Sequence, residues 1–252
     1  MASRYRTSSV LSVAGAVFAL LTPSAVAAQT VPERVALSAN GTYQGGASSV
    51  SSTVALTANS ESGSFSSAFN VKAGPALDIS GRVRIFRNVS LGVGYTSFTA
   101  NGTADINGQI PHPFYFNRAR TIAGQASLTH AETAVHVRLV IASAPGKKLQ
   151  FTAFAGPVFF SLKQGLVDSV SYTDAYPFDT ATFKSAVTRE ASQSKTAFGG
   201  GADLAYYFTK NIGIGVMASV ATATFSLAAS DSSAVSVSAG GTTFGGGLRV
   251  RF

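Results

Sequence analysis

The chain of 252 residues has no cysteine and no tryptophan, and only 12% of its residues are charged. The absence of cysteine excludes a disulfide framework and any zinc or redox site that is built on thiolates. The low charge excludes a disordered chain and a coiled coil, both of which need many more charged side chains. No linker of distinct composition divides the chain, so its length fits one domain.

What the chain has in quantity is small, β-branched and aromatic residues, with 25 Gly and 18 Phe among them. That mixture favours strands and tight turns over helices. Beyond residue 30, no stretch keeps a helical apolar period for three turns, whereas alternation with a period of two recurs. These observations predict an all-β fold.

The N-terminal segment predicts export. Arg4 and Arg6 precede an apolar core of 12 residues at positions 10–21, and small residues follow at positions 25–28. This order is typical of a secretory signal peptide. The core is too short for a membrane-spanning helix, which needs about 20 residues.

Cleavage is expected before Ala28 or Gln29, so residues 1–28 are the signal peptide and residues 29–252 the mature domain. Of the 19 Lys and Arg residues, two leave with the peptide, and the remaining 17 face 11 acids, a net charge of +6. The basic residues are scattered along the chain. We therefore expect no nucleic-acid partner.

Alternation along the mature chain marks strands with one apolar and one charged face. In residues 71–86 the odd positions are mostly apolar, while the even positions include Asp78, Arg82 and Arg84. Residues 131–141, 195–208 and 248–252 show the same pattern, whereas in residues 212–220 the face opposite the apolar one is formed by small residues. Because successive side chains of a strand point to opposite faces, each segment predicts a two-faced strand.

A soluble sandwich and a membrane barrel both alternate, so the distribution of charge and turns decides between them. A lipid-facing exterior explains the low charge, since a soluble domain of this size needs more charged side chains to cover its surface. Short polar turns alternate with long polar segments, which is typical of outer-membrane barrels. The turns lie at 86–89, 144–148 and 208–211, and the long segments at 45–62, 100–121 and 164–190, with a shorter one at 228–233.

We predict an eight-stranded antiparallel up-and-down transmembrane β-barrel. Its strands are expected at 33–45, 64–86, 89–100, 121–143, 149–163, 190–208, 212–227 and 234–252. Several exceed the roughly 9 to 11 residues that span a membrane, so the extra length should project outside it. In the absence of Trp, the aromatic girdle at the periplasmic rim is assigned to Phe86, Tyr206, Tyr207, Phe208 and Phe252.

The hairpins at 81–88 and 206–211, together with the alternating end at 247–252, resemble the small outer-membrane β-barrel family that includes the OmpA-type transmembrane domain, OmpX and the Opa adhesins. The resemblance implies a place in the outer membrane of a Gram-negative-type bacterium, among outer-membrane lipid and lipopolysaccharide. It also implies that the barrel assembly machinery recognises the terminal Phe252. It specifies architecture and not activity.

Charged residues at inward positions should form one network, here called the lumenal polar network. Its predicted members are Asp78, Arg82, Arg84, His130, Glu132, His136, Arg138, Asp203, Arg249 and Arg251. The lumen of an eight-stranded barrel is just wide enough for side chains to fill, and charges inside it must be paired. His130, Glu132 and His136 share one face, so a metal site or an acid–base pair is the alternative. We expect no cofactor and no catalytic residue.

A filled, ion-paired lumen favours a structural or surface-interaction role, in which long extracellular loops meet an extracellular ligand. A narrow channel for small solutes or ions is the alternative. A lipid-modifying enzyme is a third hypothesis, but it needs a nucleophile facing lipid, whereas alternation points His136 inward. The aromatic run at 110–116 lies in a predicted loop, where packing on its own loop or on the barrel mouth is favoured over binding a partner or lipopolysaccharide.

Overall fold

The computed structural model describes residues 33–46, 48–143, 147–229 and 233–252, so the predicted signal peptide lies outside the described residues. Within those ranges, no helix is long and apolar enough to cross a membrane. The strands are β1 (Val35–Gly45), β2 (Ser48–Ala58), β3 (Glu61–Val71), β4 (Gly74–Phe86), β5 (Val89–Pro111), β6 (Ala119–Ala142), β7 (Leu149–Asp174), β8 (Ala181–Tyr207), β9 (Ile212–Ala228) and β10 (Ala234–Arg251).

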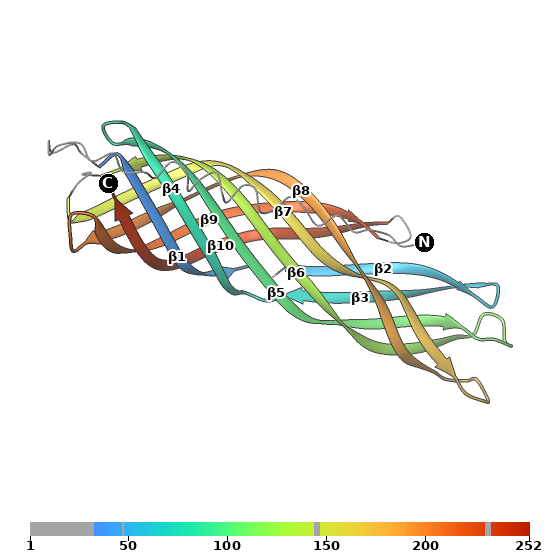
Figure 1. Ribbon diagram of the computed structural model, residues 1–252. Helices are drawn as coiled ribbons and strands as arrows, with labels where there is room; N and C mark the ends of the chain where they lie inside the picture. Colours follow the sequence, from blue (N-terminus) through green and yellow to red (C-terminus); the bar gives the residue numbers. More distant parts are fainter. Residues whose placement is uncertain (1–32, 47, 144–146, 230–232) are drawn as a thin grey trace, which may run out of the picture. The chain divides into compact units, whose positions relative to one another are not determined.

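Eight of these strands close into a ring in the order β5, β4, β1, β10, β9, β8, β7 and β6, and β6 pairs with β5 to complete it (Figure 1). Every pairing is antiparallel. The first and last strands of the chain meet in the ring, with Ala36 opposite Arg251 and Gly45 opposite Thr242. The predicted eight-stranded antiparallel barrel is confirmed.

One end of the ring, here called proximal, carries the short turns and the two ends of the described chain, since Arg34 N donates to Phe252 O at 2.6 Å. The opposite, distal end carries an extension. There, the β2–β3 hairpin continues β1 and β4, and β3 pairs with the distal part of β5 from Ser64 opposite Gln109 to Phe69 opposite Ala104. Figure 1 shows this hairpin and the long hairpins β5–β6 and β7–β8 running on beyond the ring.

The prediction of long loops at 45–62, 100–121 and 164–190 is wrong, because most of these residues are strand. Their outward residues are polar, as in a loop. Their inward residues are apolar at every second position, as at Val54 and Ile106, which are 5% and 1% exposed. The segments therefore keep the strand period with the polarity of the two faces reversed.

This reversal is clearest along β5. In its proximal part the outward side chains are apolar, as at Leu91, Val93 and Tyr95. In its distal part the inward side chains are apolar, as at Ile106 and Ile110, and the outward ones are polar. The proximal barrel is thus apolar outside and polar inside, whereas the distal extension is polar outside and apolar inside.

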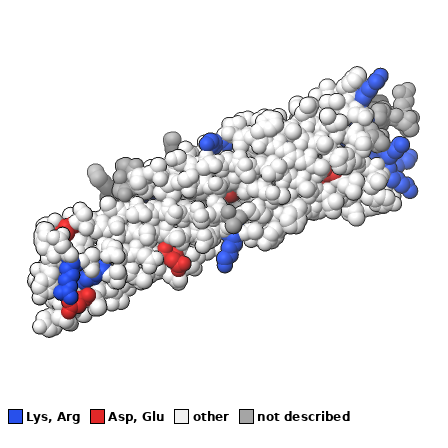
Figure 2. Space-filling model, turned by 180° about the vertical axis from the view of Figure 1, so that it is seen from behind, with Lys and Arg blue, Asp and Glu red and all other residues white. Residues whose placement is uncertain are grey.

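The apolar exterior of the proximal barrel, here called the apolar band, has the height of a membrane. Its outward positions are apolar or small over residues 149–159 of β7, 198–208 at the end of β8, 212–220 of β9 and 244–252 at the end of β10. Each run covers 9 or 11 residues, and about 9 to 11 are needed to span a bilayer. Figure 2 shows an almost charge-free surface adjoining the end where the blue side chains gather.

The distal extension has an apolar core of its own. The core includes Val50, Phe65, Phe69, Leu128, Leu162, Leu166, Phe225 and Val237, each at most 5% exposed. Burial of these side chains stabilises the extension as it does a soluble domain. These side chains also fill the lumen of the barrel toward its distal end.

Candidate functional site

The proximal lumen is organised around three carboxylates, and the first is Glu33. Its oxygens lie 3.0 Å from Arg82, 3.4 Å from Arg251 and 3.9 Å from Arg84. The three arginines come from β4 and β10 at the proximal mouth. Glu33 was not among the predicted members of the lumenal polar network. It lies in the expected strand at 33–45, which is not among the segments whose alternation was used to choose the members.

The second and third carboxylates, Asp78 and Asp203, are linked through Asn40. Asp78 is fully buried and accepts hydrogen bonds from Arg138 at 3.1 Å and from Asn40 at 2.9 Å. The side-chain oxygen of Asn40 accepts from Arg249 at 2.6 Å, and Arg249 also pairs with Asp203. The four charged side chains thus come from four strands, and Asn40 of β1 connects them into one set.

Glu132 and His130 lie closer to the distal end of the lumen, where its polar side chains meet the apolar core. Glu132 accepts from Gln44 and from the backbone N–H of Gly240, each at 2.8 Å, and lies 2.5 Å from His130. Gly240 has a φ of 82°, which favours glycine, so the carboxylate holds β10 at a local bend. The other ring nitrogen of His130 lies 2.6 Å from the amide oxygen of Gln164.

His136 does not join His130 and Glu132. Its Nε2 lies 2.9 Å from Thr96 Oγ1, one strand away. Across the described ranges of the chain, no three His, Cys, Asp or Glu side chains converge in a geometry that could hold a metal ion. The shared face that alternation predicted therefore does not bring these three side chains to one point.

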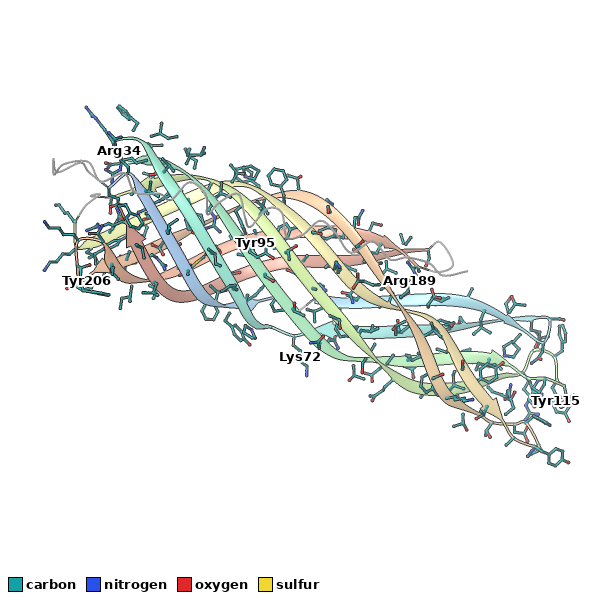
Figure 3. The ribbon with its side chains drawn as sticks, viewed as in Figure 1. Arg34, Lys72, Tyr95, Tyr115, Arg189 and Tyr206 are labelled. Atoms are coloured by element: carbon teal, nitrogen blue, oxygen red, sulfur yellow. The ribbon has the colours of Figure 1, made fainter. Side chains whose placement is uncertain are left out.

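Tyr207 corrects the predicted aromatic girdle. It is only 1% exposed, and the Arg251 guanidinium lies 3.7 Å from its ring centroid, inside the lumen. Because neighbours in a strand face opposite ways, Tyr206 and Phe208 point outward instead, at 49% and 54% exposure. Figure 3 labels Tyr206 near the proximal end and Tyr95 farther along the barrel, and both are exposed.

A cavity of about 60 Å³ remains in the proximal lumen, lined by Arg82, Arg138, Arg249 and Asp203 among others. Nearby, Arg138 Nε and Gln150 Nε2 have no hydrogen-bond partner within the described part of the chain. A space of this size is large enough for a water molecule, which can satisfy such donors where polar groups line it. The apolar core beyond it closes the lumen toward the distal end.

The tips of three hairpins are tied together at the distal end, and we call residues 59–61, 112–118 and 175–180 the distal cap. Buried Arg120 pairs with Asp174 at 2.5 Å, directly below two of the tips. Arg118 pairs with Asp179 at 3.4 Å, and the rings of Phe114 and Phe178 lie 5.3 Å apart.

Backbone contacts fix the cap further. The N–H of Asn117 donates to Glu61 at 2.7 Å, which ties the β5–β6 turn to the β2–β3 turn. His112 Nδ1 accepts from the backbone N–H of Phe114 at 3.1 Å and of Tyr115 at 3.2 Å. The turn is therefore held by its own side chain, which is itself buried.

The aromatic run at 110–116 divides into two parts. Ile110 and His112 are buried, as predicted, but Phe114, Tyr115 and Phe116 are 72%, 57% and 75% exposed. The expectation that this run packs on its own loop holds in part. The Tyr115 ring lies 4.8 Å from the His112 ring of the same turn, and the Phe114 ring lies against Phe178 of a neighbouring tip. All three side chains nevertheless keep more than half of their surface exposed.

The closed ring, the apolar band and the polar lumen define a small transmembrane β-barrel of the outer-membrane type. Short turns in such barrels face the periplasm and long hairpins face outward, so the proximal end is periplasmic. The predicted outer-membrane location follows from this architecture.

Comparison with solved structures gives likenesses of low identity, with TM-scores below 0.5. The chain is similar to Neisserial surface protein A (11% identity, 86% of this chain and 97% of that chain, TM-score 0.44). It is similar to the outer membrane protein OprG from Pseudomonas aeruginosa (8%, 88% and 97%, 0.48) and to the outer membrane protease OmpT from Escherichia coli (10%, 90% and 99%, 0.44). No protein-family model and no curated protein matches the chain. None of these likenesses assigns an activity to it.

Proposed function

We propose that this protein is a closed outer-membrane barrel that acts outside the membrane, where its distal cap contacts an external partner. The observation that carries the proposal is the exposure of Phe114, Tyr115, Phe116 and Tyr176, the last at 88%. They stand at the end of an extension whose other outward positions are mostly polar. Clustered exposed aromatic side chains are typical of interaction surfaces.

The fixed structure of the distal cap favours its binding to a partner. Ion pairs and backbone hydrogen bonds hold the three tips before any partner arrives, so binding costs less conformational entropy. Fifteen residues separate Phe159, at the distal edge of the band, from Asp174. At about 3.3 Å per residue that is about 50 Å of strand, and roughly 35 to 40 Å of height at the usual tilt. The cap therefore stands clear of the bilayer surface.

The filled lumen favours this role over a channel. In the proximal part, paired guanidinium and carboxylate groups occupy the lumen. In the distal part, the apolar core occupies it. An ion that passed through would have to shed its water in that core, at a large cost in free energy. The proposal includes no catalytic step, since His130, Glu132 and His136 are buried in the lumen.

The test compares a cap variant, Phe114→Ser with Phe116→Ser and Tyr176→Ser, with the wild type in lipid nanodiscs. Both are screened against arrays of glycans and extracellular proteins. The control is Val187→Ser, which removes an exposed apolar side chain of the extension outside the cap. We expect the wild type and the control to share a binding partner that the cap variant loses. Binding that survives in the cap variant, or a steady single-channel current from the wild type in a planar bilayer, contradicts the proposal.

A further inference from the structure

The proximal end of the barrel carries exposed charge of one sign. The five side chains, here called the proximal basic rim, are Arg34, Arg87, Lys147, Lys148 and Lys210. Arg34 immediately precedes β1, and each of the three proximal turns contributes at least one of the others. Figure 2 shows blue side chains gathered at this end. Figure 3 places Arg34 there, at the other end of the molecule from Tyr115.

Nothing in the described residues neutralises the rim. Its members form no ion pair within the described ranges, and Glu33, the nearest acid in sequence, already pairs with three lumenal arginines. The distal extension differs, because there Arg118, Lys163 and Arg189 each pair with an acid.

The rim lies directly beside the lipid-facing surface. Arg87 follows Phe86, Lys148 precedes Leu149, and these two apolar neighbours are 63% and 58% exposed. One residue of strand is about 3.3 Å, so the charged groups lie where hydrocarbon gives way to headgroups. The guanidinium of Arg87 also lies 5.4 Å from the Phe86 ring centroid. Long basic side chains at such a boundary extend their charge toward the headgroups.

We propose that the proximal basic rim binds anionic phospholipid headgroups of the periplasmic leaflet. The attraction between exposed charges falls off within about 8 to 10 Å at physiological salt, and the rim places its cations within that distance of the headgroups. A basic residue near an anionic bilayer surface typically gives about a fivefold preference for it. Five cations of one sign around the barrel would enrich the surrounding lipid in anionic species.

The experiment uses the mature protein in vesicles with spin-labelled lipids. Electron paramagnetic resonance measures how strongly the barrel restricts labelled phosphatidylglycerol compared with labelled phosphatidylcholine. The rim variant is R34Q/R87Q/K147Q/K148Q/K210Q. The matched distal control is R118Q/R189Q/K163Q/K184Q/K195Q, which removes the same number of Arg and Lys residues from exposed positions.

We expect the wild type and the distal control to prefer phosphatidylglycerol by roughly fivefold, and the rim variant to show no preference. The preference should also weaken as salt is added. Equal preference in all three proteins overturns the proposal, as does a loss confined to the distal control. Loss of the preference on addition of inorganic phosphate at fixed ionic strength would assign the rim to a free anion and also overturn it. If the quintuple rim variant does not refold, the double variant K147Q/K148Q is compared with the double control K163Q/K195Q. The expected loss of phosphatidylglycerol preference is then smaller.

Discussion

Removing the Asp78 carboxylate should cost more stability than any surface substitution. Asp78 is fully buried, and it is the carboxylate that pairs with Arg138, whose side chain is 7% exposed. Breaking a buried pair by removing one partner leaves the other charge uncompensated, at a typical cost of about 3 to 5 kcal/mol. The Arg138 guanidinium keeps its contact with the Phe154 ring, 4.6 Å away, which is worth roughly 0.5 to 2 kcal/mol. For Asp78→Ala we therefore expect a loss near the lower limit, about 3 kcal/mol.

The assay is reversible urea unfolding of the refolded barrel in lipid vesicles. Asp105→Ala is the control, because Asp105 is exposed and its side chain contacts exposed Gln125. Asp174 is unsuitable as a control, since it pairs with buried Arg120. The double variant Asp78→Ala with Arg138→Met removes both charges and should recover part of the loss. The reasoning fails if Asp78→Ala unfolds within about 0.5 kcal/mol of Asp105→Ala, or if the double variant shows the sum of the two single losses.

Three further predictions concern single positions. Gly94→Ala should destabilise the barrel, because the new Cβ would lie 2.8 Å from the Arg138 guanidinium carbon, which the ion pair with Asp78 and the contact with the Phe154 ring hold in place; an unchanged unfolding midpoint in urea would show that Arg138 can shift freely. Deletion of Phe252 should lower the folded yield in cells while refolding in detergent stays nearly intact, measured by heat-modifiable migration on a gel; equal yields in cells would remove its role as an assembly signal. Zinc should leave the thermal midpoint of the wild type unchanged, since His136 bonds to Thr96 and not to His130 or Glu132; a rise that His136→Ala abolishes would establish a metal site.

The inward positions of the proximal barrel could be chosen from the sequence because alternation is a local property of an extended backbone. Asp78, Arg138 and Arg249 were predicted to face inward, and all three are buried in the lumen. The same alternation did not lead to strands being predicted in the distal segments. There the polarity of the two faces reverses, and outward Ser, Thr and Asn side chains resemble those of a loop.

The all-β class, the number of strands in the ring and the inward parity of the proximal charges could all be predicted from local sequence, because a period of two follows from backbone stereochemistry at each residue. Which inward groups meet depends on how the strands pack against one another. This packing gave three arginines to Glu33, separated His136 from His130 and joined three hairpin tips into the distal cap. Those contacts depend on the register between strands far apart in the chain, which no local pattern of residues encodes.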